Sequence, residues 1–259
     1  MNKNTIAKVC LVGVVLFFAT DGFGKTNVIA HRGYWKTEGS AKNSISSLSN
    51  AQRLGIYGSE TDVHLTADGA VIINHDDTIQ GHDISSTPLA VLKTVKLSNG
   101  EALPTLEEYL NQTRKDKKTK LIIEIKNKKD TLLEQRTVRA VVNLVKKMKM
   151  SKAVEYISFS MNACKTLLQV EAGAPIAYLA GKDGALTPAE LKKIGLSGLD
   201  YHHSVLTMHP EWIAEAHSLG LTVNAWTVND SLVIRKLIDL GADFITTDEP
   251  VIARKLIVN

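Results

Sequence analysis

Cysteine is scarce in this sequence, which limits how the fold can be stabilised. The 259 residues include only two cysteines, Cys10 and Cys164. If residues 1–24 are removed as a targeting segment, as argued below, only Cys164 remains. A single thiol cannot form an internal disulfide. The fold must therefore be stabilised by its hydrophobic core, and a chain of this length can bury the core of one large domain.

The sequence also has no strong excess of one charge, no internal repeat and no low-complexity linker. Its net charge is +4 at pH 7 and is spread along the chain, so we expect no nucleic-acid partner. The most basic segments, residues 115–120 and 126–129, flank an expected strand and are typical of solvated loops. The absence of a linker predicts a single domain after the N-terminal segment.

The longest apolar run lies near the N-terminus and is too short to cross a bilayer comfortably. It covers residues 9–19 and follows the positively charged Lys3 and Lys8, a pattern typical of a secretory signal peptide. We therefore expect residues 1–24 to be a signal peptide and residues 25–259 to be the mature domain. That domain should be exported, periplasmic or secreted, with no stable membrane insertion. An uncleaved membrane anchor is the alternative.

From residue 27 onward, apolar β-type runs alternate with helical patterns. Strands are expected over residues 27–31, 57–65, 120–126, 155–160, 176–180, 198–201, 221–226 and 243–246. Helices are expected over residues 44–54, 105–111, 132–148, 163–172, 210–219 and 231–240, with others beginning at Thr187 and ending near Ile257. A return strand over residues 70–74 and an irregular segment over residues 78–100 form a small insertion after the second strand. About eight β-then-α units predict a single-domain α/β protein, a TIM (β/α)₈ barrel.

The main alternative to the barrel is an open, doubly wound parallel sheet. Such a sheet would carry a glycine-rich phosphate-binding turn directly after its first strand. Residues 31–39, HRGYWKTEG, do not match that turn, so the barrel is favoured.

Charged, polar and aromatic side chains recur where the expected strands end. In a (β/α)₈ barrel these ends meet at one face, which carries the active site. Side chains that only fill a core are rarely charged, so charged residues at these strand ends predict a functional site. Its members are His31, Arg32, Glu60, Asp62, Glu124, Lys126, Tyr201, His202, Trp226 and Asp248.

Three carboxylates stand on the second and third expected strands. Glu60 and Asp62 share a face, because side chains two positions apart in a strand point the same way, and Glu124 follows on the next strand. One divalent cation would relieve their repulsion, and an all-oxygen ligand set favours Ca²⁺ or Mg²⁺ over zinc. From spacing alone, a salt-bridged cluster with Arg32 and Lys126 is an equal alternative.

The two basic residues suit an anionic ligand. Arg32 offers a planar fork that matches a phosphate, and Lys126 offers a point charge on the same face as Glu124. Three acids and two bases leave the pocket at about −1, and a divalent ion would bring it to about +1. The loaded site should attract a small-molecule phosphodiester.

His31 and His75 are candidates for proton transfer. Displacement at a phosphodiester requires one group to accept a proton and another to donate one, and imidazoles titrate near neutral pH. A lone histidine is more often structural, which is the alternative for each of them. His64 could also point inward, and its role stays open.

Aromatic residues near the strand ends could form an apolar wall for an alcohol moiety. The candidates are Tyr34, Phe159 and Trp226. Ordinary packing is the alternative for all three.

In their order along the chain, these motifs resemble the glycerophosphodiester phosphodiesterase family. Its His-Arg, Glu-x-Asp and His signature stands here as His31-Arg32, Glu60-x-Asp62 and His75. The segments LIIEIK (121–126), NAWTVND (224–230) and ADFITTDEP (242–250) are similar to later family segments, so the resemblance spans the mature chain. It implies metal ligation by Glu60, Asp62 and Glu124, catalysis by His31 and His75, and a substrate-binding role for Trp226 alongside Arg32 and Lys126.

The resemblance implies an enzyme, a phosphoric diester hydrolase that releases glycerol phosphate and an alcohol from glycerophosphodiesters with one divalent cation, Ca²⁺ or Mg²⁺. The alternatives are a related phosphodiesterase acting on a lysophospholipid or a glycerophosphate polymer, and a non-catalytic barrel that binds phosphate ligands. The histidine pair argues against the non-catalytic barrel. One departure concerns the rim: the chain has Ala41-Lys42-Asn43-Ser44 where the family usually has Pro-Glu-Asn-Thr, so Lys42 reverses a charge. The oligomeric state stays open.

Overall fold

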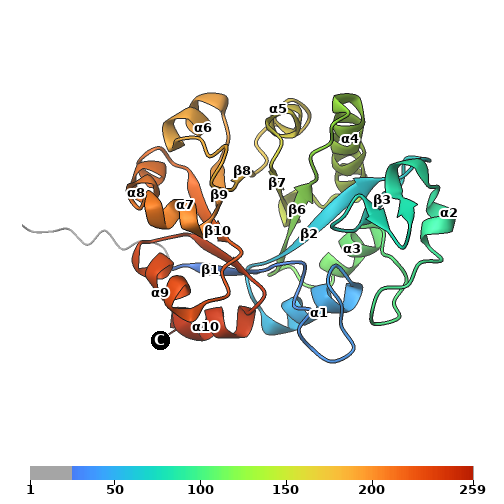
Figure 1. Cartoon of the computed structure of the whole chain (residues 1–259), viewed down its shortest axis with the longest axis horizontal. Coiled ribbons are helices and arrows are strands. Elements are labelled where there is room, and N and C mark those ends of the chain that lie inside the picture. The colour runs from blue at the N-terminus through green and yellow to red at the C-terminus, as the bar shows by residue number, and fades with distance from the viewer. Residues whose placement is uncertain (1–24, 259) are drawn as a thin grey trace, which may run out of the picture.

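A closed barrel of parallel strands forms the centre of the molecule, and helices surround it (Figure 1). This computed structural model describes residues 25–258, and the expected signal peptide, residues 1–24, lies outside them. β1 (Asn27–Ala30) pairs with both β2 (Gly58–Leu65) and β11 (Phe244–Thr247), which closes the sheet. The strands between them are β6 (Lys120–Ile125), β7 (Val154–Ser158), β8 (Ile176–Ala180), β9 (Gly198–His202) and β10 (Thr222–Trp226). The predicted (β/α)₈ barrel is therefore confirmed.

The helices pack on the outside of the barrel. They are α1 (Ile45–Leu54), α3 (Leu106–Thr113), α4 (Thr131–Lys147), α5 (Met161–Val170), α6 (Pro188–Ile194), α7 (His203–Met208), α8 (Glu211–Ser218), α9 (Ser231–Asp239) and α10 (Pro250–Val258). Capping boxes start α3 at Thr105 and α6 at Thr187, where the sequence predicts that helices begin. The short helix α7 was not expected; the side chain of His202 caps it. None of the helices within residues 25–258 has the length and hydropathy needed to cross a membrane.

An excursion between β2 and α3 covers one side of the barrel mouth. β3 (Val71–Ile73) pairs antiparallel with the end of β2, and β4 (Thr78–Ile79), β5 (His82–Asp83), the 3₁₀ turn η1 (Ile84–Ser86) and α2 (Leu89–Leu92) follow. Ile72, Ile84, Leu92, Val95 and Leu103 give this segment its own small core. The excursion thereby places the loop of residues 74–77 beside the end of β2.

Side-chain alternation along the strands separates the outer core from the barrel interior. On β6, Leu121, Ile123 and Ile125 pack in the core beneath the helices, whereas Ile122 belongs to a small cluster inside the barrel with Ile29. The next inward position on β6 is Glu124, which pairs in register with Asp62 of β2. The interior is therefore apolar low in the barrel and acidic above, where the strands end.

Candidate active site

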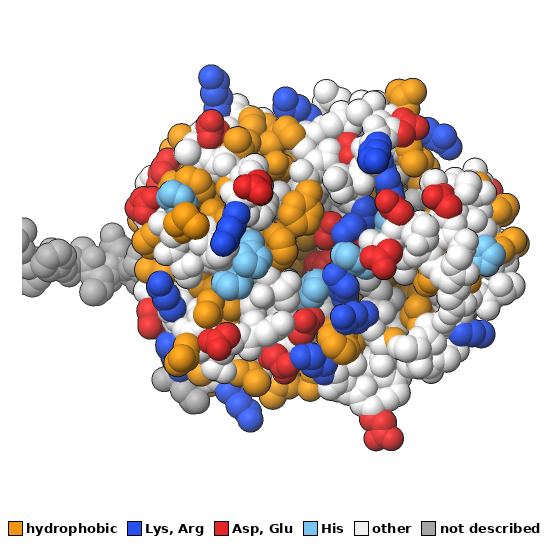
Figure 2. Space-filling view, viewed as in Figure 1, with side chains coloured by type: hydrophobic (Ala, Val, Ile, Leu, Met, Phe, Trp, Pro, Cys, Tyr) orange, Lys and Arg blue, Asp and Glu red, His pale blue; other side chains and the backbone are white. Residues whose placement is uncertain are grey.

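A cavity of about 200 Å³ opens at the C-terminal ends of the barrel strands. Figure 2 shows a hollow at the centre of this face, in which acidic and histidine side chains are gathered. The cavity is lined by His31, Arg32, Glu60, His75, Glu124, Lys126, Ile157, Phe159, Leu179, Asp200, Trp226, Thr227 and Thr246. The cavity thus brings together the residues predicted for catalysis, metal binding and substrate binding, except Asp62, which contacts Arg32 and Lys126. Of the other polar strand-end residues, Tyr201, His202 and Asp248 do not line it.

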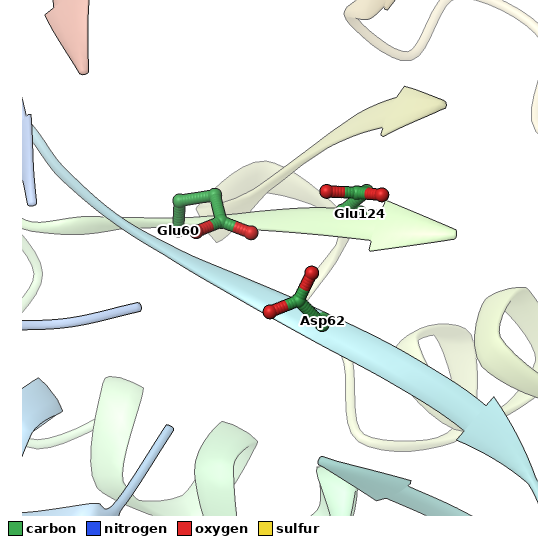
Figure 3. A group of neighbouring side chains, drawn as sticks. All are labelled: Glu60, Asp62 and Glu124. Carbon is green, nitrogen blue, oxygen red and sulfur yellow. The ribbon is translucent and has the colours of Figure 1, made fainter. Parts of the chain in front are cut away.

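The three predicted carboxylates form one buried cluster (Figure 3). Glu60 and Asp62 come from β2 and Glu124 from β6, and one ligand atom of each lies within 4.8 Å of the others. Oε1 of Glu60 is buried and accepts no hydrogen bond, whereas the buried Oε1 of Glu124 lies beside the Lys126 ammonium. Buried carboxylate oxygens without donors are costly unless a cation coordinates them. The donor set therefore fits one divalent cation with oxygen ligands.

The three carboxylates of the cluster differ in the direction in which their pKa values are shifted. Burial, followed by the charges of Asp62 and Glu124, raises the pKa of Glu60 well above its usual range. Burial and the charge of Asp62 raise the pKa of Glu124 to about 7. Burial also acts on Asp62, but the charge of Lys126 and its other partners outweigh it and lower the Asp62 pKa. A divalent cation would favour the ionised form of all three.

Two basic side chains and an amide surround Asp62. Lys126 Nζ donates to Asp62 Oδ1 at 3.2 Å and forms an ion pair with Glu124 Oε1 at 2.7 Å. Arg32 Nε lies 3.6 Å from Asp62 Oδ2 and has no hydrogen-bond partner. Asn43 Nδ2 donates to the same oxygen at 2.8 Å. Part of the predicted salt-bridge alternative is therefore present, but it leaves Glu60 Oε1 unsatisfied.

The backbone after β1 adopts an unusual conformation that places Arg32. Arg32 has φ of 55° and Gly33 has φ of 78°, and the Arg32 amide N–H donates to Glu60 Oε2 at 2.9 Å. A Cβ at position 33 would lie 2.3 Å from Ser47 Oγ, so only glycine fits the position. The His-Arg-Gly sequence is thus explained by geometry: the turn brings a backbone donor to the acid cluster.

His31 is held by the other end of the chain. Its Nδ1 lies 2.9 Å from Asp248 Oδ1, and Asp248 also accepts hydrogen bonds from Trp35 Nε1 at 3.2 Å and Asn229 Nδ2 at 3.1 Å. Burial opposes ionisation of Asp248, but the contact with His31 and the other donors hold its pKa below the usual range. An ionised carboxylate only accepts, so His31 carries a proton on Nδ1 and can accept one at Nε2.

His75 lies in the loop after β3 and is 41% exposed. Its Nδ1 is 2.6 Å from Asp76 Oδ1, the carboxylate of the next residue. It lines the same cavity as His31, so the two imidazoles face one site from separate segments of the chain.

An apolar wall faces the charged side of the cavity. Phe159 and Trp226 pack edge to face with ring centroids 5.3 Å apart, and Trp226 Nε1 donates to the backbone oxygen of Asp200 at 2.9 Å. His202 packs behind Trp226, with ring centroids 5.3 Å apart. Tyr34 is not part of this wall, because it packs against the outer core, as the packing alternative predicts.

On β9 the inward-facing residue is Asp200, whereas Tyr201, which was expected in the site, faces outward. The hydroxyl of Tyr201 donates to Leu186 O at 2.6 Å and the residue packs in the outer core, so Tyr201 does not belong to the site. Asp200 lines the cavity instead; its Oδ1 is buried without a partner, and burial raises its pKa to about 8. A polar residue inside an apolar strand was a sequence signal for Asp200 that the interpretation missed.

Asn43 and Asp248 also have contacts that the sequence alone did not predict. Ser44 is the N-cap of α1, and the preceding Asn43 forms hydrogen bonds with Asp62 and Thr61. Asp248 was recognised as a polar strand-end residue, without its partner His31.

The fold and site define a class, a TIM-barrel phosphoric diester hydrolase, and the comparisons with known proteins give the family. Residues 31–252 match the model of the Glycerophosphoryl diester phosphodiesterase family. The chain belongs to this family, as the ordered motifs predict.

Individual relatives agree with the family match. The crystal structure of a glycerophosphodiester phosphodiesterase from Parabacteroides distasonis is 48% identical, with a TM-score of 0.87 over 90% of this chain and 97% of that one. An Oleispira antarctica phosphodiesterase, solved in complex with the product sn-glycerol-3-phosphate, is 27% identical, with a TM-score of 0.79 over 90% and 97% of the two chains. The glycerophosphodiester phosphodiesterase of Caldanaerobacter subterraneus is 26% identical over 241 residues, 87% of this chain and 95% of that protein.

Proposed function

We propose that this protein hydrolyses a small glycerophosphodiester to glycerol phosphate and an alcohol, with Glu60, Asp62 and Glu124 holding one divalent cation, Ca²⁺ or Mg²⁺. The observation that carries the proposal is a single cavity in which two imidazoles, two cationic side chains and an acid cluster with an unsatisfied oxygen converge. The relative from Oleispira antarctica, solved with sn-glycerol-3-phosphate, supports glycerol phosphate as the product.

The charged residues bind and orient the phosphate. Arg32 has an unpaired Nε beside the cluster, and its guanidinium can donate to phosphate oxygens. Lys126 adds a point charge that its contacts with Glu124 and Asp62 keep protonated, because their charges outweigh burial and raise its pKa. A cation bound at the acid cluster would supply further positive charge to stabilise the oxygens on phosphorus.

His31 and His75 transfer the protons. One imidazole accepts the proton of the attacking oxygen, and the other protonates the departing alkoxide. His31 is suited to either task because Asp248 holds its Nδ1 and leaves Nε2 for the substrate. The apolar wall of Phe159 and Trp226 excludes water from one side of the reacting group.

Alanine variants of the two histidines test this function. His31→Ala and His75→Ala should each lower kcat on an alkyl diester by roughly 10² to 10⁴ and leave affinity for a non-hydrolysable analogue nearly unchanged. The variant that lacks the general acid should recover on a nitrophenyl ester, whose leaving oxygen needs no proton. His209→Ala, in the α7–α8 connection, is the matched control. Near-wild-type turnover by both variants on the alkyl diester would eliminate the mechanism.

The choice among substrates and metals needs a second measurement. A panel of glycerophosphodiesters, a lysophospholipid and a glycerophosphate polymer should be assayed with EDTA and after Ca²⁺ or Mg²⁺ is restored. Preference for a lysophospholipid or polymer would favour the related activities, and binding without turnover would favour the non-catalytic alternative.

We also propose that the mature protein is exported, periplasmic or secreted, and begins near Lys25. The support is the N-terminal charge and hydropathy pattern. Mass spectrometry of exported material should find the shortened chain with one free thiol; an intact Met1 on a membrane-bound chain would contradict the proposal.

A further inference from the structure

A buried histidine and a partly buried lysine follow the acid-cluster strands toward the barrel mouth. His64 follows Asp62 by two positions on β2, and Lys128 follows Lys126 by two positions after β6. Lys128 Nζ lies 2.7 Å from His64 Nδ1, and the side chain of His64 is 1% exposed. The Lys128–His64 contact therefore resembles the Lys126–Asp62 contact, but lies two residues further along each segment, nearer the barrel mouth.

The hydrogen-bond chemistry of the pair determines what His64 can do. An ammonium group has only donors, so Nδ1 of His64 must accept from Lys128. The ring proton therefore resides on Nε2, which lies 3.3 Å from the backbone oxygen of His75. Lys128 thus sets the tautomer that allows His64 to donate to the loop carrying His75.

The same lysine fastens that loop at a second point. Lys128 Nζ donates to the carboxylate of Asp77, two positions beyond His75. Lys128 is itself fixed from behind, because its backbone N–H donates to Glu134 Oε1 at 3.0 Å and Glu134 is buried in α4. A continuous set of contacts therefore runs from α4 to residues 75 and 77.

We propose that His64 is a positioning residue, which Lys128 orients to hold the His75 carbonyl and so to place the His75 imidazole over the cavity. The inference rests on the proposed function, because it requires His75 to transfer a proton. His75 needs such support: its side chain is 41% exposed and it follows a strand of only 3 residues. A small displacement of a reacting group can cost about 10²-fold in rate.

Two substitutions of His64 distinguish its contact with Lys128 from its contact with the His75 carbonyl. His64→Asn keeps a polar atom near Lys128 but removes the donor that reaches His75, and should lower kcat by roughly 10- to 100-fold with KM unchanged. His64→Gln can place an amide N–H near the Nε2 position and should retain most of the activity. Lys128→Met should lower kcat in the same direction. Lys118→Met, at an exposed position before β6, is the control and should change nothing.

A double-mutant cycle distinguishes positioning of His75 from a general structural role. In a His75→Ala background, adding His64→Asn should cause no further loss of kcat, because the group that it positions is gone. A second loss of the same size would overturn the inference, as would wild-type kcat in folded His64→Asn. If that variant does not fold, a kcat for Lys128→Met equal to that of the control Lys118→Met would overturn it. Wild-type turnover by His75→Ala alone would instead refute the proposed role of His75.

Discussion

Asp248 and His31 lie 2.9 Å apart although 217 positions separate them in the chain. β1 pairs in parallel with β11, and Ala30 stands opposite Thr247, so the residues that follow each strand emerge side by side. Closure of the barrel therefore creates the pair that orients one candidate catalytic histidine.

Replacing Asp248 should reduce turnover more than binding. Asp248→Asn removes the charge that holds Nδ1–H of His31 and permits the wrong tautomer, so kcat should fall by about 10² or more. Steady-state kinetics and analogue binding measure the two effects. Asp239→Asn, on the exposed end of α9, is the control, and unchanged kcat in a folded Asp248→Asn protein would show that Asp248 does not support His31.

Removing one carboxylate should weaken cation binding. Glu124→Gln replaces one carboxylate of the acid cluster with a neutral ligand, so the affinity for Ca²⁺ and Mg²⁺ should fall at least about tenfold. Calorimetric titration and the cation-dependent rise in Tm provide independent readouts. Glu107→Gln on the exposed face of α3 serves as control. Wild-type affinity in Glu124→Gln would remove Glu124 from the ligand set.

Asp200 should make stability fall as pH rises. Its usual pKa of 3.8 applies to the unfolded chain, and burial raises the folded-state pKa to about 8. Between these values the unfolded chain releases a proton that the folded protein retains, so the free energy of unfolding decreases by at most about 1.4 kcal/mol per pH unit. Below pH 4 and above pH 8 this contribution is constant.

Denaturant unfolding of Asp200→Asn against wild type isolates the contribution of Asp200. The variant should gain stability relative to wild type between pH 4 and pH 8. Asp183→Asn, an exposed substitution, should show no such trend. A pH-independent difference for Asp200→Asn would contradict a buried, protonated Asp200.

Lys42 should assist binding of the anionic substrate. Its Nζ lies 4.6 Å from the centroid of Trp35 at the rim, and Trp35 donates to Asp248 beside His31. Lys42→Glu should raise KM a few-fold and reduce its dependence on salt, with Lys42→Gln intermediate, because the local field on the anion changes sign. Kinetics at low and high ionic strength measure this, with Lys118→Glu as control. An unchanged KM in all variants would show that the rim charge is irrelevant.

Much of the fold and part of the acid cluster could be predicted from local sequence patterns. Alternation along residues 58–65 places Glu60 and Asp62 on one face without any tertiary information, because the strand repeats every two residues. Helix starts at Thr105 and Thr187 follow from side chains that cap the adjacent backbone. The number and order of strand–helix units then predicted the barrel, and the ordered motifs predicted the family.

Only the tertiary structure decided which side chains meet across strands. The pairing of Asp248 with His31 depends on closure between the first and last strands, and the contact of Lys128 with His64 depends on the register of β6 against β2. The inward position of Asp200 and outward position of Tyr201 depend on the phase of β9, which the polarity of Tyr201 obscured. Sequence periodicity sets relative faces within one strand, whereas neighbours, register and absolute phase are set by packing of the whole barrel.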